Sequence, residues 1–394
     1  MKTNPLTIGV DASCWTNRRG FGRFTRELLT ALLRYDQTNR YVFVTDSATA
    51  AVAANGIPFP ENAEVIEVKT DVAPSEAASG SGRRSVKDLW RMSRAASARR
   101  FDAFFFPAVY SYFPVLGSPI CVTVHDLIAD NHPTLVFPEW RLKMFWKLKQ
   151  NLAIRQARRI LTVSEYSRGE ILRFYHLPER RVALTTEGPH SAFRPLAAEV
   201  RILEKHGIPI NRPFFIHIGG FSPHKNLAVL AEAFADIDGA NLVLAGDYRG
   251  DSFHSGYEPL RRRIDELGIT DRVVFPGYVP DEELAVILNV ATALVFPSLE
   301  EGFGLPAVEA MACGTPVLAS DRGSLPEIVG EAGLFFGPND GTSLSGLMTR
   351  LLVDAPQREA MARASLERAR QFTWEKAARS TLACLLETAN RSSP

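Results

Sequence analysis

Cysteine is scarce in this sequence, because its 394 residues include only four, at positions 14, 121, 313 and 384. No two of them form a C-x-x-C pair, and four are too few for a disulfide framework in a chain of this length. The opening residues, "MKTNPLTIGVD", contain no apolar run long enough for a signal peptide. We therefore expect a reducing, cytoplasmic compartment.

The sequence also lacks a complete dinucleotide fingerprint. "NRRGFGRF" places Gly20 and Gly22 between the first predicted strand and the first predicted helix, but G-x-G-x-x-G needs a third glycine where Thr25 stands. A nicotinamide-dependent dehydrogenase is therefore not expected. Glycines here let a backbone approach a phosphate beside a helix N-terminus, although a plain pair of turn glycines explains them equally well.

A strong net charge is missing, since 45 basic and 44 acidic residues leave only +1. We expect no nucleic-acid partner on this ground and because no recognised binding module is present. Two segments, 83–102 and 139–159, are nevertheless locally basic, and the second interleaves Trp140, Phe145 and Trp146. Such helices can lie on anionic lipid at the inner face of the cytoplasmic membrane; an ordinary solvated basic face is the alternative.

An uninterrupted membrane span is also absent. Residues 103–124 carry no charged side chain, but Pro107, Pro114, Pro119 and Gly117 interrupt them. A helix would lose backbone hydrogen bonds and gain ring clashes at each proline. We therefore predict two buried strands here, "AFFF" and "ICVTV", joined by a loop.

Short apolar runs alternate with amphipathic stretches along the whole chain. This alternation predicts an α/β fold with parallel sheets covered on both faces. The first series of predicted strands is "LTIGVDAS", "YVFVT", "AEVIEV", "DAFFF", "ICVTV", "RILTVS" and "RVALTT". The second series is "PFFIHIG", "NLVLAG", "RVVFPG", "ATALVFPS", "TPVLAS" and "AGLFFG".

A turn-rich stretch, "EGPHSAFRPL", separates the two series. We predict one doubly wound domain over residues 1–190, a second over 191–372, and a closing helix over 373–394 that packs back on the first domain. Ligands of open α/β sheets bind at the carboxyl ends of the strands. We expect the chemistry on those loops, in a cleft between the two sheets.

Polar residues follow two of the predicted strands directly. "VTVHDL" puts His125 and Asp126 after a strand of the first half, and "IHIGGFSPHKN" puts Gly220 and Lys225 after a strand of the second. His125 could serve the reaction or be a buried histidine with a satisfied hydrogen bond, and Asp126 could be a cap. A lysine at a helix start adds positive charge where an anion is already favoured, although lone lysines are commonly solvated.

The stretch "SLEEGFGLPAVEAMACG" places two carboxylates around a short helix, predicted from about Leu305 to Cys313. Glu301 lies in the loop before the helix and Glu309 lies inside it. Gly304 and its neighbours leave backbone N–H groups accessible at the helix entrance. Carboxylates beside an anion site make sense as acceptors for sugar hydroxyls. A capping Glu301 and an exposed Glu309 are the structural alternative.

The E-x7-E block, "PSLEEGFGLPAVEAMACGTPVLAS", resembles that of the retaining GT-B glycosyltransferases of family 4, the group 1 transferases. "HIGGFSPHKNL", "VTVHDLI", "LTVSEYSR" and "GFGRFTREL" resemble further landmarks, so the resemblance covers essentially the whole chain. The mannosyltransferase-like branch that works on bacterial surface polysaccharides is the most similar. The resemblance implies two Rossmann-like domains that face each other across a cleft.

The resemblance also implies roles for residues. A nucleotide-sugar donor would bind to 191–372, and a saccharide or lipid-linked acceptor to 1–190. Catalytic roles fall to His125, Lys225 and Glu301, and Asp126 would help to bind the acceptor. Glu309 would hold the ribose, Lys225 the diphosphate and Glu301 the donor sugar. The donor-binding set is Gly20, Gly22, Gly220, His224, Lys225, Arg249, Phe303, Gly304, Leu305 and Glu309.

One departure concerns the diphosphate. Many relatives carry an arginine where this chain reads Gly219-Gly220-Phe221, so a second cation must come from elsewhere, with His224 and Arg249 as candidates. We expect no metal and no other cofactor, since the histidines show no ligand spacing. The D-x-D at 236–238 follows a predicted helix and is better explained as a turn.

The resulting expectation is transfer of a hexose from GDP-mannose or a UDP-sugar in bacterial polysaccharide or glycan synthesis. Because both glutamates are committed to hydroxyl binding, retention would follow from front-face substitution. A sugar-nucleotide epimerase of the same fold is the alternative, and would convert the donor alone. A silent sugar- or nucleotide-binding module is the third hypothesis, and would convert nothing.

Overall fold

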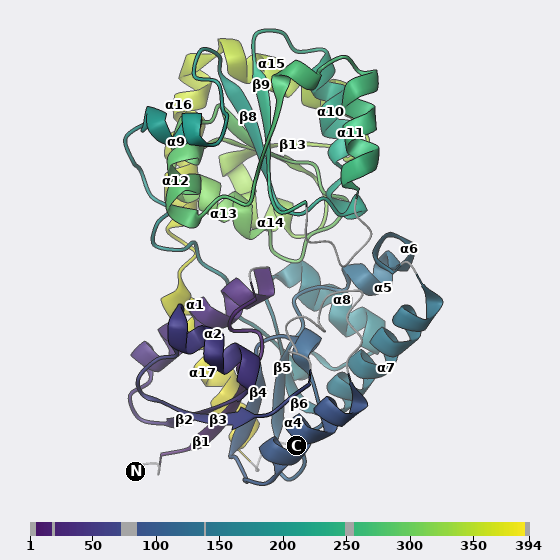
Figure 1. Ribbon diagram of the computed structural model, residues 1–394, viewed down its shortest axis with the longest axis vertical. Coiled ribbons are helices and arrows are strands. Elements are labelled where there is room, and N and C mark those ends of the chain that lie inside the picture. The colour runs from purple at the N-terminus through teal and green to yellow at the C-terminus, as the bar shows by residue number, and fades with distance from the viewer. Residues whose placement is uncertain (1–4, 18–19, 72–84, 138, 249–255, 391–394) are drawn as a thin grey trace. The chain divides into compact units, whose positions relative to one another are not determined.

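The computed structural model describes residues 5–17, 20–71, 85–137, 139–248 and 256–390. Its contacts divide the chain into two compact units (Figure 1). Unit 1 comprises Met1–Asp130, Phe137–Glu187 and Trp374–Pro394, and unit 2 comprises Asn131–Val136 and Gly188–Thr373. The short segment 131–136, which the sequence-based boundaries include in the first domain, therefore belongs by its contacts to unit 2.

Unit 1 is built on a parallel seven-stranded sheet in the order β3-β2-β1-β4-β5-β6-β7. Its strands are β1 Thr7–Asp11, β2 Arg40–Asp46, β3 Ala63–Val68, β4 Ala103–Phe106, β5 Ile120–Thr123, β6 Ala157–Thr162 and β7 Val182–Leu184. Its helices are α1 Gly20–Tyr35, α2 Ser47–Asn55, α4 Val86–Ser97, α5 Ile128–Asn131, α7 Trp140–Gln156, α8 Glu165–Tyr175 and α17 Trp374–Ala389, with short turns η1 Val109–Ser111 and η2 Glu179–Arg181.

Unit 2 is built on a parallel six-stranded sheet in the order β10-β9-β8-β11-β12-β13. Its strands are β8 Phe214–Ile218, β9 Asn241–Ala245, β10 Val273–Gly277, β11 Ala293–Phe296, β12 Val317–Ser320 and β13 Gly333–Phe336. Its helical elements are α6 Pro133–Val136, α9 Val200–Lys205, η3 Pro223–Lys225, α10 Leu227–Ala235, α11 Tyr257–Glu266, η4 Thr270–Arg272, α12 Asp281–Val290, α13 Leu305–Ala312, α14 Leu325–Val329, η5 Gly330–Ala332, α15 Gly341–Val353 and α16 Ala355–Ala369.

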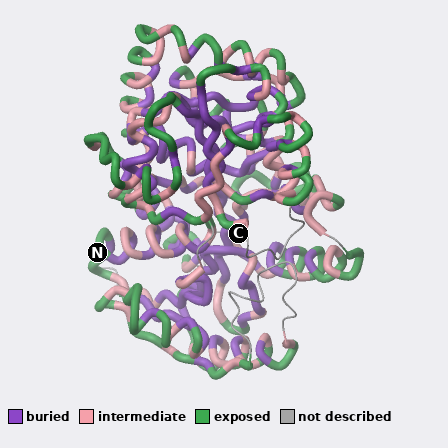
Figure 2. Tube along the Cα trace, turned by 45° about the horizontal axis from the view of Figure 1, so that its top comes forward, coloured by how far each residue is buried: buried purple, intermediate pink, exposed green. Residues whose placement is uncertain are grey.

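The predicted α/β fold is confirmed, since each predicted strand segment contains a strand of the structure. Strands such as β4, β5, β11 and β12 are buried at every residue, as expected of parallel strands covered on both faces. In Figure 2 the buried residues gather inside the units and the exposed ones lie around their outside. The uncharged stretch 103–124 forms β4, η1 and β5 rather than a helix. Among the described residues, no helix is both long and apolar enough to cross a membrane.

The C-terminal helix α17 belongs to unit 1, where it packs against α1 and the strands β4 to β7 (Figure 1). Its inner face carries Ala377, Thr381 and Leu385, all of them fully buried. The hydroxyl of Thr185 lies 3.2 Å from both the Ala377 carbonyl oxygen and the Thr381 hydroxyl. The end of the chain therefore completes the core of the unit in which the chain begins.

Candidate active site

Each sheet has one point at which the strand order reverses. In unit 1 the reversal lies between β1 and β4, and in unit 2 between β8 and β11. At such a point the connections leave for opposite faces of the sheet, which opens a crevice at the carboxyl ends of the two strands. The loops after β1, β4, β8 and β11 are therefore where the candidate residues should gather.

In unit 2, an ion pair joins the loops that follow β8 and β11. The Nζ atom of Lys225, the last residue of η3, donates to Oε1 of Glu301 at 2.6 Å. The ammonium also lies 5.3 Å from the centre of the Phe296 ring, at the end of β11. The two residues are 76 positions apart in the sequence, and both side chains are largely buried. The structure thus unites the two groups for which the diphosphate and donor-sugar roles are expected.

The electrostatics of this pair hold Glu301 in its charged form. Burial by itself would raise the pKa of the carboxyl, but the nearby Lys225 charge and hydrogen bond outweigh it, and the pKa lies below its ordinary value. His224 behaves differently, because burial and the Lys225 charge lower its pKa to about 4. The protein by itself thus favours the neutral imidazole, and a role for His224 as a second diphosphate cation stays a prediction.

The entrance to α13 offers fewer free N–H groups than an anion nest requires. Gly304 precedes the helix with φ of +90°, and no side chain caps the helix. Pro306 has no N–H, and the N–H of Ala307 donates to the Gly304 carbonyl oxygen at 2.9 Å, so the positive end of the helix dipole is the main attraction for an anion. Phe303 and Leu305 are themselves buried, so the backbone rather than their side chains is what this turn can offer a ligand.

Glu309 lies one turn inside α13 and is almost completely buried. This excludes the exposed Glu309 of the structural alternative, and the absence of a side-chain cap on α13 excludes a capping Glu301. Buried carboxylates are rare unless their oxygens are used. The ribose contact expected of Glu309 stays a prediction.

His217, which the sequence reasoning did not single out, contacts the same region from inside β8. Its Nδ1 atom donates to the Val295 carbonyl oxygen at 3.0 Å, and its ring stacks on Phe296. Within the described residues its buried Nε2 atom has no hydrogen-bond partner, and burial lowers its pKa to about 4. A polar residue that interrupts the apolar run "FFIHI" is the signal that could have revealed it.

Glu300 is a second residue that the sequence reasoning missed. It is buried, its Oε1 atom accepts from Asn131 Nδ2 at 3.0 Å, and its Oε2 atom lies 2.8 Å from His132 Nε2. These contacts explain why the segment 131–136 belongs to unit 2. Of the adjacent glutamates, Glu300 thus binds this segment, whereas Glu301 binds Lys225.

The three predicted glycines of the phosphate loops differ in their surroundings. Gly20 and Gly22 lie in the first turn of α1 rather than in a loop before it, so that part of the prediction is wrong. A Cβ at Gly22 would lie 2.1 Å from the Asn17 carbonyl oxygen, so close backbone packing requires this glycine. Among the described residues, no atom lies within 4 Å of a Cβ built at Gly20, and only Ser222 Oγ, at 4.0 Å, lies near one built at Gly220. Those two backbones are open to a ligand.

In unit 1, His125 follows β5 and reaches the loop after β4. Its Nε2 atom lies 3.1 Å from the Pro107 carbonyl oxygen, which can only accept, so Nε2 carries a proton. Its ring meets the Phe24 ring edge-on, and Nδ1 lies 3.6 Å from Glu187. This geometry is that of the structural alternative, a largely buried and hydrogen-bonded histidine. A part in the reaction stays a prediction.

Asp126 accepts from the backbone N–H of Ile128 at 3.0 Å, at the start of α5. This is the capping role that was weighed for it. The D-x-D at 236–238 lies in the turn after α10, with Ile237 buried in the core of unit 2. Arg249, the other candidate second cation, lies outside the described residues. No group of three metal-ligating side chains occurs among the residues that the structure describes.

Two doubly wound parallel units of seven and six strands are the architecture of the GT-B fold, which glycosyltransferases share. More particularly, residues 18–188 match the model of Glycosyltransferase Family 4, and residues 200–368 match that of the Glycosyl transferases group 1. The chain belongs to this glycosyltransferase family.

Individual relatives agree with this assignment. The chain is 32% identical to O-antigen chain mannosyltransferase B of Escherichia coli over 73% of its own length and 76% of the relative's. Sucrose-phosphate synthase from Thermosynechococcus elongatus superimposes with a TM-score of 0.74 at 21% identity, over 98% of this chain and all of that one. HepE of Anabaena, solved with UDP and glucose, gives 0.73 at 18% identity over 97% of this chain and all of that one. At such identities the two structures show the fold alone.

Proposed function

We propose that this protein transfers a hexose from a nucleotide-diphosphate sugar to a saccharide or lipid-linked acceptor in bacterial polysaccharide synthesis, with retention at the anomeric carbon. The observation that carries the proposal is the Lys225–Glu301 pair at the β8/β11 reversal point, beside the uncapped start of α13. A cation beside the positive end of a helix dipole suits a diphosphate, and a charged carboxylate suits sugar hydroxyls. The donor needs both kinds of group side by side.

Lys225 and Glu301 would bind different parts of the donor. An ammonium has three N–H donors, of which Lys225 uses one on Glu301, so two are left for diphosphate oxygens. Glu301 has a second carboxylate oxygen for a hydroxyl of the sugar. Glu309 would accept from the ribose hydroxyls. We propose that no metal is required, because Lys225 and the α13 N-terminus would stabilise the negative charge that develops on the diphosphate.

The proposed chemical step is front-face substitution. The acceptor hydroxyl oxygen forms a bond to the anomeric carbon on the face from which the diphosphate leaves. The bond between that carbon and the phosphate oxygen breaks, its electron pair stays on the diphosphate, and a diphosphate oxygen takes the acceptor's proton. The protein's own contribution is to position the reactants and to stabilise the leaving group. His125 would contact the donor sugar near this carbon.

The relatives suggest which donors to test first. The mannosyltransferase from Escherichia coli points to mannose as the sugar, for which we test GDP-mannose, and HepE, solved with UDP and glucose, points to a UDP-sugar. A thermal-shift screen with GDP-, UDP-, ADP- and dTDP-sugars chooses among them. The anomeric configuration of the product, read by NMR, then tests retention, and an inverted product would contradict the front-face step.

The first prediction tests the donor site. Glu309→Gln should weaken nucleotide binding by about tenfold or more, because a charge-assisted hydrogen bond to the ribose becomes a neutral one. Isothermal calorimetry with the nucleoside diphosphate measures the change. Glu331→Gln, at an exposed glutamate of the same unit, is the matched control and should bind normally. An unchanged affinity in Glu309→Gln would refute the ribose assignment.

What supports a transferase over the epimerase alternative is membership of a glycosyltransferase family. The two activities separate on one measurement, since an epimerase converts the nucleotide sugar without an acceptor. Turnover of the purified protein with donor alone, followed by NMR, should show no change in the sugar's configuration. Conversion of the donor alone would overturn the proposed transferase.

A further inference from the structure

Helix α7 carries large apolar side chains on two opposite faces. Its inner face packs against β5 and β6 and includes Trp146, Ala153 and Ile154, all buried. Its outer face exposes Trp140, Met144, Phe145, Leu148 and Leu152, each between 44% and 70% accessible. We call these five residues the outer ridge. A helix that is apolar on both sides is typical of one with an apolar neighbour on both sides.

The outer ridge is a continuous stripe rather than scattered exposure. Trp140, Met144, Leu148 and Leu152 follow one another at intervals of four residues, so they line up along one side of the helix. Single exposed apolar residues are common on protein surfaces, but a contiguous patch of this size marks an interaction site. Trp146 does not belong to it, since it is buried and its indole N–H donates to Asp130 at 3.2 Å.

The charge around the outer ridge has one sign. Helix α7 contains five basic residues and no acidic one. Lys149 points to the core side, where Nζ donates to the Tyr110 carbonyl oxygen at 3.0 Å. Of the other four, Lys147 interacts electrostatically with Asp130, whereas Arg141, Lys143 and Arg155 form no ion pair with any described residue. An apolar stripe flanked by an excess of cations is complementary to a surface that is apolar inside and anionic outside.

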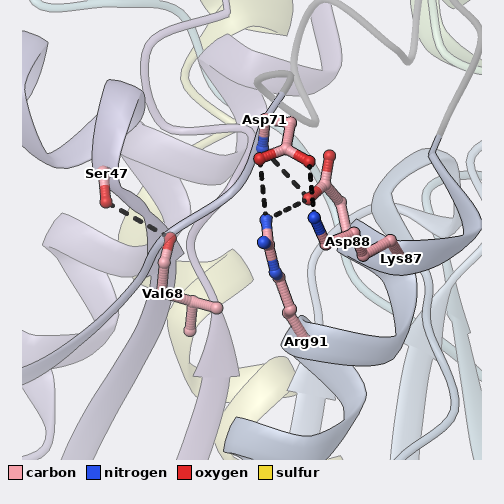
Figure 3. Close-up of polar contacts among 6 residues, drawn as sticks. All are labelled: Ser47, Val68, Asp71, Lys87, Asp88 and Arg91. Carbon is pink, nitrogen blue, oxygen red and sulfur yellow. Dashed lines mark hydrogen bonds and ion pairs between the residues drawn. The ribbon is translucent and has the colours of Figure 1, made fainter.

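Helix α4, in the other basic segment, offers a contrast (Figure 3). There Arg91 pairs with Asp71 at 2.9 Å and with Asp88 at 3.0 Å, and Lys87 lies 3.5 Å from Asp71. The cations of α4 in this cluster are thus neutralised within the protein. Only Val86 and Trp90 are large exposed apolar residues on this helix. The two basic segments therefore differ in kind, and α7 is the one with both apolar area and free charge.

We infer that α7 is an interfacial membrane anchor: its outer ridge inserts into an anionic lipid bilayer while its cations contact the lipid phosphates. A second copy of this chain fits less well, because a two-fold contact through α7 would bring two basic clusters together. The long stems of the lysines and arginines allow their charges to reach the headgroups beside a buried ridge. The inference does not depend on the proposed function, since lipid binding is measured without donor or acceptor.

The test uses the full-length protein and co-sedimentation with vesicles. We expect binding to vesicles that contain phosphatidylglycerol and little binding to pure phosphatidylcholine. Met144→Gln/Leu148→Gln should lower the partition coefficient by about tenfold or more, because two apolar side chains no longer leave water. The matched control, Ile210→Gln/Val353→Gln, changes two equally exposed apolar residues of unit 2 and should bind normally.

Two further arms make the test specific. Lys143→Gln/Lys147→Gln should weaken binding to anionic vesicles, and added salt should weaken it further. Tryptophan emission should shift to the blue on binding, and Trp140→Phe should abolish most of this shift while Trp90→Phe leaves it. Unchanged binding of Met144→Gln/Leu148→Gln would overturn the proposal. So would a blue shift carried by Trp90, or a dimer in light scattering that the α7 variants dissociate.

Discussion

The Lys225–Glu301 pair is better explained by ligand binding than by stability. Both side chains are largely buried, so both charges have lost much of their hydration. A buried ion pair regains little more than this cost, and well-packed apolar residues often stabilise a protein as much. Apolar residues would not provide a fixed ammonium with unused N–H groups beside a charged carboxylate. The pair is therefore better explained as a binding site for a polar ligand.

His217 lies against this pair and makes a residue-scale prediction about pH. Its pKa is lowered from 6.5 to about 4 in the folded protein, so only the unfolded chain takes up its proton between these values. Protonation of His217 therefore leaves the free energy of unfolding unchanged above pH 6.5. As the pH falls from 6.5 towards 4, it lowers this free energy by about 3 kcal/mol in total. His217→Asn, which keeps a donor for the Val295 carbonyl oxygen, should flatten this part of the profile, as measured by denaturant unfolding.

The control for this prediction is His176→Asn. His176 is exposed and has φ of +51°, a conformation that asparagine tolerates. Its replacement should leave the pH profile as it is. An equally steep loss of stability between pH 6.5 and 4 in His217→Asn would show that other groups cause it, with His224 the first to examine because its pKa is also about 4.

At the scale of elements, the turn after β12 supports the loop that carries Glu301. Gly323 has φ of +62°, and a Cβ there would lie 2.6 Å from the Glu301 backbone nitrogen. The N–H of Ser324 donates to the Glu301 carbonyl oxygen at 3.1 Å. The two loops are therefore in direct backbone contact, and a side chain at 323 must displace Glu301 from Lys225.

Gly323→Ala should accordingly weaken both stability and nucleotide binding. Gly268→Ala is the matched control, because Gly268 has φ of +66° and nothing within 4 Å of a Cβ. In the control, the free energy of unfolding should fall by about 1 kcal/mol, because alanine is strained in the left-handed conformation, and nucleotide should bind normally. Gly323→Ala should cost about 2 kcal/mol or more. Equal stability and equal nucleotide affinity in the two variants would show that the Gly323 contact does not support Glu301.

The elements were predictable where local pattern decides them. Apolar runs located every strand, and Pro306 and Gly314 located α13 to within a residue. The start of α1 was misplaced because glycine is a poor helix former, whereas Gly20 and Gly22 both lie in the first turn of the helix. The Lys225–Glu301 pair joins loops far apart in sequence, and the lowered pKa of His224 depends on tertiary surroundings. Neither has a local signal.

At the scale of the whole molecule, the net charge of +1 conceals a strongly uneven surface. Acidic partners neutralise the Arg91 cluster of α4, whereas α7 has no acidic residue of its own. Composition alone could not separate these two basic segments. The separation required the positions of Asp71 and Asp88, and it turns a general expectation of membrane contact into a claim about one helix.

The last prediction concerns the C-terminal helix α17 and its place in the core of unit 1. Because α17 completes the core of unit 1, a chain that ends after Thr373 loses the buried contacts of Ala377, Leu385 and their neighbours. Unit 1 should then lose its cooperative unfolding transition, while unit 2, which keeps all its strands, should stay folded.

Hydrogen exchange read by mass spectrometry should show β1 and β4 to β6 deprotected, and β8, β9 and β11 still protected. A chain that ends after Asn390 retains α17 and is the control. Full protection of β1 and β4 to β6 in the shorter chain would mean that α17 covers unit 1 without being needed for its fold.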